Sequence, residues 1–388
     1  MTKPTVLIAP DKFKGSLTAA DVVAAVSRGL MAVSPVSVRG VPVADGGDGT
    51  IAAAVAAGYA EVPVTASGPT GEPVATRYAR LGETAVVEMA DVSGLVCLPE
   101  GRLEPLVASS RGTGEVMAAA IDAGCTSLVV GIGGSASTDG GAGLVAALGA
   151  TLHDGQGQVI ADGGAALQSL ETLETSALAD RMRGVSVTIA CDVDNPLTGT
   201  RGAAAVYGPQ KGADEAQVHQ LDGALSHFAD VVASHTGRDE RDAAGAGAAG
   251  GVGYAALALL EATLRPGIDL IFDLVGFHTA LEGVDFAITG EGSLDDQTLN
   301  GKAPAGVAAA ASARGIPVVA VCGRTTLSPA RLAEAGIQAT YALSDLEPDL
   351  QRSMSGAASL LEQLGQQIAR EHFEAGADDD SGRQEEIG

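Results

Sequence analysis

The sequence predicts an α/β fold in which parallel strands alternate with helices. Short apolar runs are followed by glycine-rich loops and then by stretches with helical periodicity, a succession that recurs from residue 36, from residue 127 and from residue 286. Strands that alternate with helices usually form parallel sheets with helices on their faces. Because the chain has 388 residues, we expect two or three domains.

The composition indicates a folded, acidic protein. Hydrophobic residues make up 46% of the chain, which is enough for a sizeable core. The formal net charge of −25 argues against nucleic acid as a partner, because nucleic-acid phosphates need patches of lysine and arginine. A few local donors can still bind a small anion in such a protein.

The N-terminal elements carry clear local signals. An apolar strand is predicted at Thr5–Ala9, and Thr18 has the pattern of a helix N-cap with Asp21 three residues later. The helix after Thr18 has apolar residues on one face: Val22, Val26, Leu30 and Val33. A second strand is predicted at Val36–Val43, and the loop 44–49 leads from it into an alanine-rich helix.

The alternation of strands and helices is interrupted between residues 59 and 89, where predicted strands follow one another with turn residues at Ser67–Gly71 and Gly82-Glu83. This pattern predicts hairpins at a passage between domains. Further strands are predicted at Leu128–Val130, Val185–Ala190, Phe286–Thr289 and Val318–Val321, and further helices at Tyr254–Leu264, from Pro304 and at Pro329–Ala335. The end of the chain, from Glu374, is polar and is expected to be disordered.

The sequence also bears on the compartment. No apolar run reaches membrane-spanning length, and Met1–Ile8 leads directly into a strand, so we expect neither a signal peptide nor an anchor. The four cysteines are scattered without a CxxC pair, and the six histidines form no metal-binding motif. We therefore expect a cytoplasmic protein without a membrane partner or a zinc site.

The loop 131–143 contains six glycines between a strand and a helix. Glycines let backbone N–H groups approach a phosphate, and the start of a helix adds partial positive charge. A tight turn needs only one or two glycines, so this loop predicts an anion-binding site.

Acidic residues follow several predicted strands, in the loops 44–49, 191–197 and 290–296. Ligands of open parallel sheets bind at the carboxyl ends of the strands, where such loops lie. Phosphoryl transfer needs acids of this kind, because one or two carboxylates hold Mg²⁺ with the substrate phosphates and another can accept the hydroxyl proton. Four basic residues in or beside the loops could neutralise a phosphate or a substrate carboxylate: Lys14, Arg111, Lys211 and Lys302.

A second glycine run, Gly245–Gly250, matches the GxGxxG pattern of dinucleotide-binding proteins. No hydrophobic strand precedes it, as that motif requires, and the sequence contains no Walker A loop. A dinucleotide-dependent oxidoreductase and a non-catalytic nucleotide-binding protein remain as alternatives to a kinase.

Seven segments, taken in order, resemble the type I glycerate kinase family. They are residues 8–17, 42–50, 131–143, 191–197, 207–213, 247–251 and 288–293. The resemblance implies two α/β domains, a flavodoxin-like domain inserted into a second parallel-sheet domain of Rossmann-like or restriction-endonuclease-like type, with the active cleft between them. We accordingly expect a discontinuous domain at 1–66 and 284–375, an inserted domain at 67–283 and a disordered acidic tail at 376–388.

The resemblance further implies that the protein transfers the γ-phosphate of ATP to a hydroxyl of D-glycerate with the help of Mg²⁺. The expected product is 2-phosphoglycerate, with 3-phosphoglycerate as the alternative, and the sequence carries no signal for an oligomeric state.

The strand-end positions and the resemblance together suggest roles for individual residues. We expect catalysis by Asp192, Asp295 and Glu291, with Asp192 and Asp295 also holding Mg²⁺. Glycerate is expected to contact Asp11, Lys14, Asp45, Gly46, Gly47 and Arg111. ATP is expected to contact Gly133, Gly134, Ser135, Ser137, Asp139, Asn195 and Lys302. Which acid is the base and which binds the metal stays open at this point.

Overall fold

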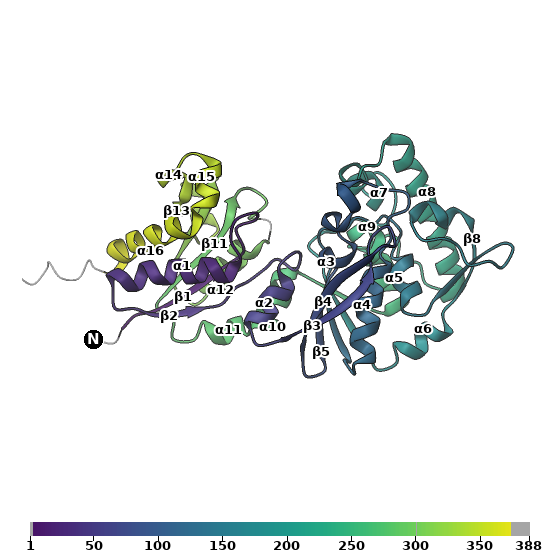
Figure 1. Ribbon diagram of the computed structural model, residues 1–388, viewed down its shortest axis with the longest axis horizontal. Helices are drawn as coiled ribbons and strands as arrows, with labels where there is room; N and C mark the ends of the chain where they lie inside the picture. The colour runs from purple at the N-terminus through teal and green to yellow at the C-terminus, as the bar shows by residue number, and fades with distance from the viewer. Residues whose placement is uncertain (1–2, 300, 374–388) are drawn as a thin grey trace, which may run out of the picture. The chain divides into compact units, whose positions relative to one another are not determined.

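The computed structural model describes residues 3–299 and 301–373 (Figure 1), so the tail expected at 376–388 lies outside the described residues. The chain divides into two compact units. Unit 1 comprises Met1–Asp45 and Phe272–Gly388, and unit 2 comprises Gly46–Ile271. Both units are α/β, and both contain parallel strands, as the sequence predicts.

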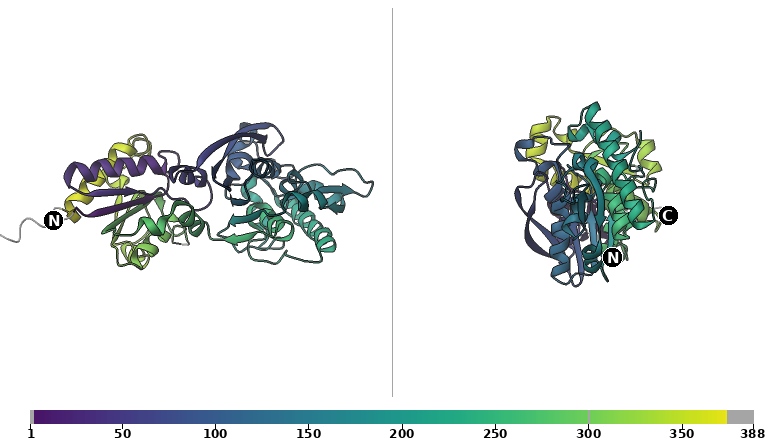
Figure 2. Two further views of the ribbon diagram at one scale, coloured as in Figure 1. Left: turned by 90° about the horizontal axis from the view of Figure 1, so that it is seen from below. Right: turned by 90° about the vertical axis from the view of Figure 1, so that its right-hand side faces the viewer.

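Unit 1 contains a five-stranded sheet in the order β13-β12-β11-β1-β2, with every neighbouring pair parallel. Its strands are β1 (Thr5–Pro10), β2 (Ser37–Gly40), β11 (Phe286–Leu294), β12 (Val318–Thr325) and β13 (Ala339–Ala342). Its helices are α1 (Ala19–Val33), α11 (Phe277–Ala280), α12 (Ala303–Ser312), α13 (Pro329–Glu334), α14 (Leu343–Leu346), α15 (Leu350–Ser355) and α16 (Ala357–Phe373). Helices cover both faces of this sheet (Figure 2, left).

The first and last described helices, α1 and α16, lie side by side on one face of that sheet (Figure 1). The predicted N-cap of α1 is confirmed, because Thr18 and Asp21 form a complete capping box. Apolar residues of both helices share one core with β1 and β11: Val26, Leu30, Leu361, Ile8 and Ile288 are all buried there.

Unit 2 contains a six-stranded mixed sheet in the order β10-β9-β6-β5-β4-β3. Its strands are β3 (Ala60–Ser67), β4 (Pro73–Leu81), β5 (Thr84–Glu88), β6 (Ser127–Gly131), β9 (Ser186–Ala190) and β10 (Thr263–Arg265). The first four strands in sheet order, β10, β9, β6 and β5, pair in parallel, and β4 runs antiparallel to β3 and β5. The predicted hairpin turn at Gly82-Glu83 is confirmed.

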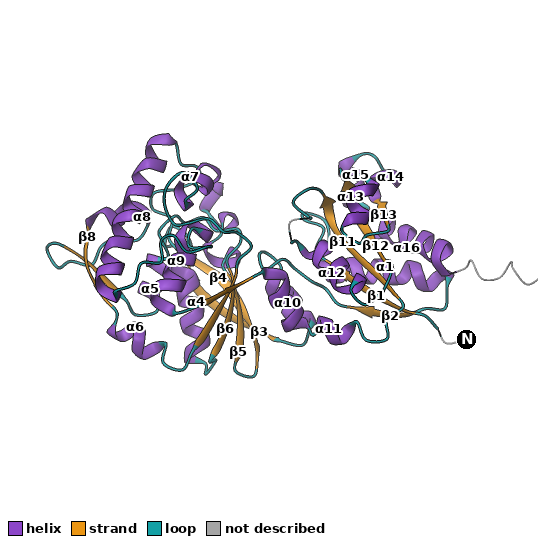
Figure 3. Ribbon diagram, turned by 180° about the vertical axis from the view of Figure 1, so that it is seen from behind, coloured by secondary structure: helices purple, strands orange, loops and turns teal. Residues whose placement is uncertain are grey.

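Helices surround the sheet of unit 2 (Figure 3). They are α2 (Thr50–Ala56), α3 (Ala90–Ser93), α4 (Arg111–Asp122), α5 (Ala142–Ala147), α6 (Ser176–Arg181), α7 (Ala203–Tyr207), α8 (Glu215–Thr236) and α9 (Ala248–Leu260). A small hairpin of β7 (Thr151–Asp154) and β8 (Leu170–Glu174) lies outside the sheet. The chain returns from unit 2 to unit 1 within helix α10 (Gly267–Val275), between Ile271 and Phe272.

Residues 46–66 lie in unit 2, whereas the sequence predicts them in the discontinuous domain. The physical reason is strand pairing, because β3 is hydrogen-bonded to β4 from Ala60↔Arg80 to Ser67↔Pro73. A strand belongs to the sheet that satisfies its backbone groups.

Several predicted elements have different bounds in the structure. The loop expected from residue 290 begins as strand, because β11 stays paired with β12 as far as Leu294↔Thr325. Helix α9 spans Ala248–Leu260 rather than Tyr254–Leu264, with left-handed backbone at Ala249, Gly250 and Gly251. The predicted end of this helix is wrong, because Thr263–Arg265 pairs with β9 as strand β10. Within the described ranges, no helix combines the length and apolar character that crossing a bilayer requires.

Candidate active site

The glycine-rich loop of unit 2 follows β6 at the carboxyl end of the sheet. Gly133 and Gly134 are exposed, whereas the residues from Ser135 to Gly143 are buried. Gly134 has φ +74°, a conformation that favours glycine. Among the described residues, none accepts a hydrogen bond from the N–H of Gly133 or Gly134. The structure therefore presents two backbone donors at the place where ligands of such sheets bind.

Gly46 and Gly47 lie against this loop. A Cβ atom added to Gly131 would be 2.5 Å from the carbonyl oxygen of Gly46, and one added to Gly133 would be 3.0 Å from the Cα atom of Gly47. Two glycine segments that are far apart in the sequence thus approach backbone to backbone. Unit 2 brings together these four predicted positions: Gly46, Gly47, Gly133 and Gly134.

Asp192 lies two residues after the end of the neighbouring strand β9, and its side chain is exposed. Its Oδ1 atom accepts a hydrogen bond of 2.9 Å from the backbone N–H of Gly267, the first residue of α10. Gly267 also lies against Gly46, because a Cβ atom added to Gly46 would be 2.7 Å from the Gly267 Cα atom. Asp192 therefore belongs to the same edge of unit 2 as the glycine segments.

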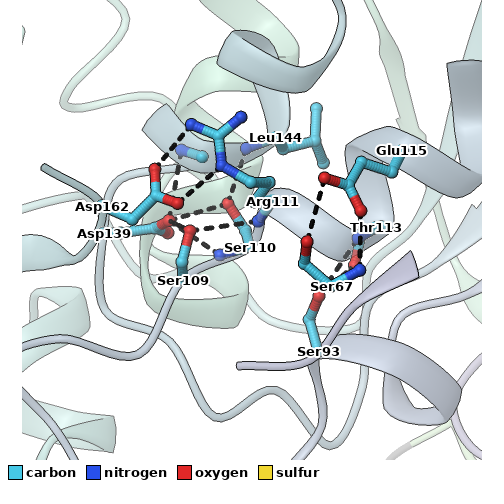
Figure 4. A network of polar contacts seen from close by, with 11 residues as sticks. Ser67, Ser93, Ser109, Ser110, Arg111, Thr113, Glu115, Asp139, Leu144 and Asp162 are labelled. Atoms are coloured by element: carbon cyan, nitrogen blue, oxygen red, sulfur yellow. Dashed lines mark hydrogen bonds and ion pairs between the residues drawn. The ribbon is translucent and has the colours of Figure 1, made fainter. Parts of the chain in front are cut away.

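The side chains of Asp139 and Arg111 both contact other residues of unit 2 (Figure 4). Asp139 is fully buried and accepts hydrogen bonds from the backbone N–H and the hydroxyl of Ser110, at 2.8 and 2.9 Å, which joins the loop to the start of α4. The guanidinium of Arg111 forms a bidentate ion pair with Asp162, with N···O distances of 2.6 and 2.7 Å. Both side chains thus have strong partners within unit 2.

Asn195 is also held by internal contacts. Its amide donates to the carbonyl oxygen of Arg201 at 2.8 Å, and its Oδ1 atom accepts from the hydroxyl of Tyr207 at 2.6 Å. The carbonyl oxygen of Asn195 accepts from the N–H of Gly247, in the GxGxxG run. A Cβ atom added to Gly250 would be 2.1 Å from the carbonyl oxygen of Ser137. The glycines of this run therefore allow close packing against two loops. A dinucleotide site requires a strand directly before the run, and the element found there is helix α8.

Unit 1 has its own acidic group at the carboxyl end of its sheet. Asp11 follows β1, and its N–H donates to the carbonyl oxygen of Gly290 at 2.8 Å, which places it next to Glu291 on β11. Burial raises the pKa of Asp11 from 3.8 to about 7, and the charges of Asp45 and Glu291 raise it as well. The hydrogen bond from the Lys12 N–H acts in the opposite direction.

Glu291 is buried beside the remaining predicted residues of unit 1. Burial raises the pKa of its carboxyl, while the hydroxyl of Thr298, which donates to it, and the charge of Lys302 act in the opposite direction. The Oδ1 atom of Asp295 accepts from the N–H of Gln297 at 2.8 Å. Lys14 is exposed at the end of the same sheet. Unit 1 thus contains six of the predicted site residues: Asp11, Lys14, Asp45, Glu291, Asp295 and Lys302.

Two further ionisable residues are buried in unit 2: Glu88, for which the sequence predicted no role, and Lys211, which the sequence suggested only as one of four cations that could neutralise a phosphate or a substrate carboxylate. Glu88 ends β5 and accepts hydrogen bonds from the N–H groups of Gly49 and Ile51, and burial, with the charge of Asp91, raises its pKa to about 7. It carries the signal that identified Asp192, an acid at the carboxyl end of a strand. Lys211 is fully buried and reaches the glycine-rich loop. The segment 207–213 around it was among those that indicated the family.

Comparisons with known proteins agree with these observations. The sequence profile of the Glycerate kinase family matches residues 6–372. The chain is 43% identical over 368 residues to the glycerate kinase of Bacillus subtilis (strain 168), an alignment that covers 94% of this chain and 96% of that protein. It is 41% identical over 356 residues to the glycerate 2-kinase of Escherichia coli (strain K12), covering 91% of this chain and 93% of that protein.

A solved structure is similar as well. The crystal structure assigned as a glycerate kinase 2 from Salmonella typhimurium LT2 matches with a TM-score of 0.85 and 40% sequence identity, and the match covers 97% of this chain and 99% of that one. The sequence profile, the curated relatives and the fold point in one direction. The chain belongs to the glycerate kinase family.

Proposed function

We propose that this chain is an ATP-dependent kinase that phosphorylates D-glycerate, with the 2-hydroxyl as the favoured acceptor. The hydroxyl oxygen bonds to the γ-phosphorus of ATP, the bond from that phosphorus to the β–γ bridging oxygen breaks, and a carboxylate accepts the hydroxyl proton. The products are 2-phosphoglycerate and ADP.

The observation that carries the proposal is the exposed Gly133-Gly134 turn at the carboxyl end of β6. Backbone N–H donors at such a turn suit phosphate oxygens, and they need no basic side chain. The segment Gly46–Gly47 and the carboxylate of Asp192 lie along the same edge of unit 2. This edge therefore offers phosphate donors and a candidate base together.

Asp192 of unit 2 is our first candidate for the base, and Asp295 and Glu291 of unit 1 are our further candidates for catalysis. Lys14, Asp11 and Asp45 are our candidates for binding glycerate, since Lys14 is an exposed cation that can pair with a substrate carboxylate. For Arg111, Asp139 and Asn195, the internal partners favour an indirect role, in which they hold the loops that contact the substrates.

The candidate site suits a Mg²⁺ ion that binds together with the phosphates of ATP. Among the described residues, no group of three or more His, Cys, Asp or Glu side chains could hold a metal ion by itself. Mg²⁺ usually takes only one or two carboxylates together with substrate phosphates, and Asp192 and Asp295 are hard oxygen donors of the right kind. When bound, Mg²⁺ would neutralise charge on the phosphates.

The test is a product analysis of the purified protein with MgATP and D-glycerate. We expect ADP and phosphoglycerate in equal amounts, and ³¹P NMR distinguishes the 2-phosphate from the 3-phosphate. L-Glycerate is the matched control for the stereochemistry of the acceptor. Binding of NAD without binding of ATP would instead support the oxidoreductase alternative.

We further propose that unit 2 is the inserted domain and unit 1 the discontinuous one. Trypsin should then cut native protein first near Arg238, which is exposed in the connection after α8. Early cleavage within 128–149 would contradict a packed glycine-rich loop.

A cytoplasmic location is part of the proposal, supported by the four free cysteines, Cys97, Cys125, Cys191 and Cys322.

A further inference from the structure

Lys211 lies at the end of the short 3₁₀ helix η4 (Pro209–Lys211), and only 2% of its surface is exposed. Its Nζ atom donates a hydrogen bond of 2.9 Å to the hydroxyl of Ser135 and one of 2.5 Å to the carbonyl oxygen of Ser137. Both acceptors belong to the glycine-rich loop. A buried amine thus supports the part of the loop that directly follows the exposed Gly133-Gly134 turn.

The same loop contains polar groups that the described residues do not satisfy. The hydroxyl oxygens of Ser137 and Thr138 are buried, and no described residue makes a hydrogen bond to either of them. Buried hydroxyls without partners are rare in folded proteins and often mark places where a ligand or an ordered water completes the structure. Two such hydroxyls in the loop that the buried amine contacts are a second indication that this loop is built for a ligand.

The amine is costly to bury in its charged form. Burial lowers the pKa of Lys211 from 10.5 to about 7, and the charge of Asp139 only partly offsets this effect. Asp139 is the charged group that acts on the amine within the described part of the chain, and its own oxygens accept from Ser110, Gly141 and Gly143. Near neutral pH the charged and neutral forms of the amine are therefore close in free energy.

We propose that Lys211 is a positioning residue for the phosphates of ATP. It holds Ser135 and Ser137 so that the Gly133-Gly134 backbone faces the phosphates, and its amine gains a proton when the phosphates bind. The inference rests on the proposed function. An anion brought close to the amine favours its charged form, so nucleotide binding should draw a proton from solvent. A lysine that served folding alone would show no such linkage.

The experiment is calorimetric titration of the full chain with the magnesium complex of adenylyl imidodiphosphate, a non-hydrolysable ATP analogue. Titrations slightly above neutral pH, in buffers that differ in ionisation enthalpy, report the protons taken up on binding. We expect uptake with the wild type. In Lys211→Met we expect the uptake from this amine to be lost and the dissociation constant to rise about ten-fold, the effect of losing one charge-assisted contact.

Gln210→Met is the matched control, because Gln210 is the exposed neighbour of Lys211 and should bind like the wild type. A folded Lys211→Met protein with wild-type affinity and wild-type proton uptake would overturn the inference. If Lys211→Met does not fold, Ser135→Ala decides, because removing this acceptor should weaken binding and unchanged affinity would overturn the inference. Failure of the wild type to bind the analogue would instead count against the proposed function.

Discussion

The carboxylate of Asp192 accepts a hydrogen bond of 2.9 Å from the backbone N–H of Gly267. This contact joins the carboxyl end of β9 to the first turn of α10, so it places a negative charge where a helix N-terminus stabilises one. It also helps to fix the position of the carboxylate at the sheet edge. Position and orientation are what a base for phosphoryl transfer requires.

Replacing Asp192 by Asn should therefore reduce turnover without unfolding the protein. We expect kcat to fall by about 10²-fold or more, the low end for loss of a general base. The amide oxygen of Asn can still accept from Gly267, so the melting temperature should change little. Asp194→Asn is the control, because Asp194 is exposed and paired with Arg201. Near-normal turnover of Asp192→Asn would move the role to Asp295 or Asp45.

Lys14→Ala should mainly weaken glycerate binding. Lys14 is exposed, and we assign its ammonium group to the substrate carboxylate, a contact made equally in the ground state and the transition state. Loss of such uniform binding raises KM and leaves kcat nearly unchanged. Steady-state kinetics with glycerate varied at saturating MgATP measure both constants. Arg28→Ala is the control, since Arg28 forms an exposed ion pair with Glu362; a lower kcat at unchanged KM for Lys14→Ala would refute the assignment.

Asp11 should make stability depend on pH. Its pKa is about 7 in the folded protein against an ordinary 3.8, so between these values the folded chain holds a proton that the unfolded chain has released. Stability should therefore fall as the pH rises from about 4 to about 7, with a slope of at most ~1.4 kcal/mol per pH unit from this group.

Asp11→Asn should remove this slope, because Asn does not titrate. The measurement is thermal unfolding of both proteins at several values between about pH 5 and about pH 8, and the stability gain of the variant should grow up to about pH 7 and then level off. Parallel curves for the two proteins would show that Asp11 is not the titrating group. Glu88 is expected to add a slope of the same sign, so the difference between the proteins is the quantity to compare.

Glu88→Gln should loosen the loop 46–49. The two carboxylate oxygens of Glu88 accept from Gly49 and Ile51, at 2.8 and 3.1 Å, and Gln offers only one oxygen for these two donors. One N–H is left without an acceptor, which should cost about 1–3 kcal/mol of stability. Urea unfolding measures this loss, and hydrogen exchange at Gly49 and Ile51 should become faster in the variant.

Glu83→Gln is the matched control for Glu88→Gln. Glu83 is exposed in the turn before the same strand, and its carboxylate accepts from the hydroxyl of Thr126 at 3.2 Å. We expect the control to leave stability and exchange unchanged. Equal effects of the two substitutions would mean that Glu88 does not hold the loop.

The sequence by itself determined what depends on neighbouring residues. The capping box of Thr18 and Asp21, the turn at Gly82-Glu83 and the strand before Asp192 all rest on interactions within a few positions, and all three are found in the structure. The alternation of strands and helices predicted parallel sheets for the same reason, since periodicity is a local property.

Only the tertiary structure decided which distant residues meet. Glu291 lies on a strand because β12 supplies hydrogen bonds to it, and β3 belongs to unit 2 because β4 pairs with it. Neither partner can be read from the local sequence.

The ionisation of the candidate site has the same origin. Burial and the neighbouring Asp45 and Glu291 raise the pKa of Asp11, and the contact of Lys211 with Ser135 joins residues 76 positions apart. Desolvation and Coulomb forces depend on distance in space, so they arise only when the chain has folded. The candidate site residues were therefore visible in the sequence, whereas their protonation and their partners were set by the fold.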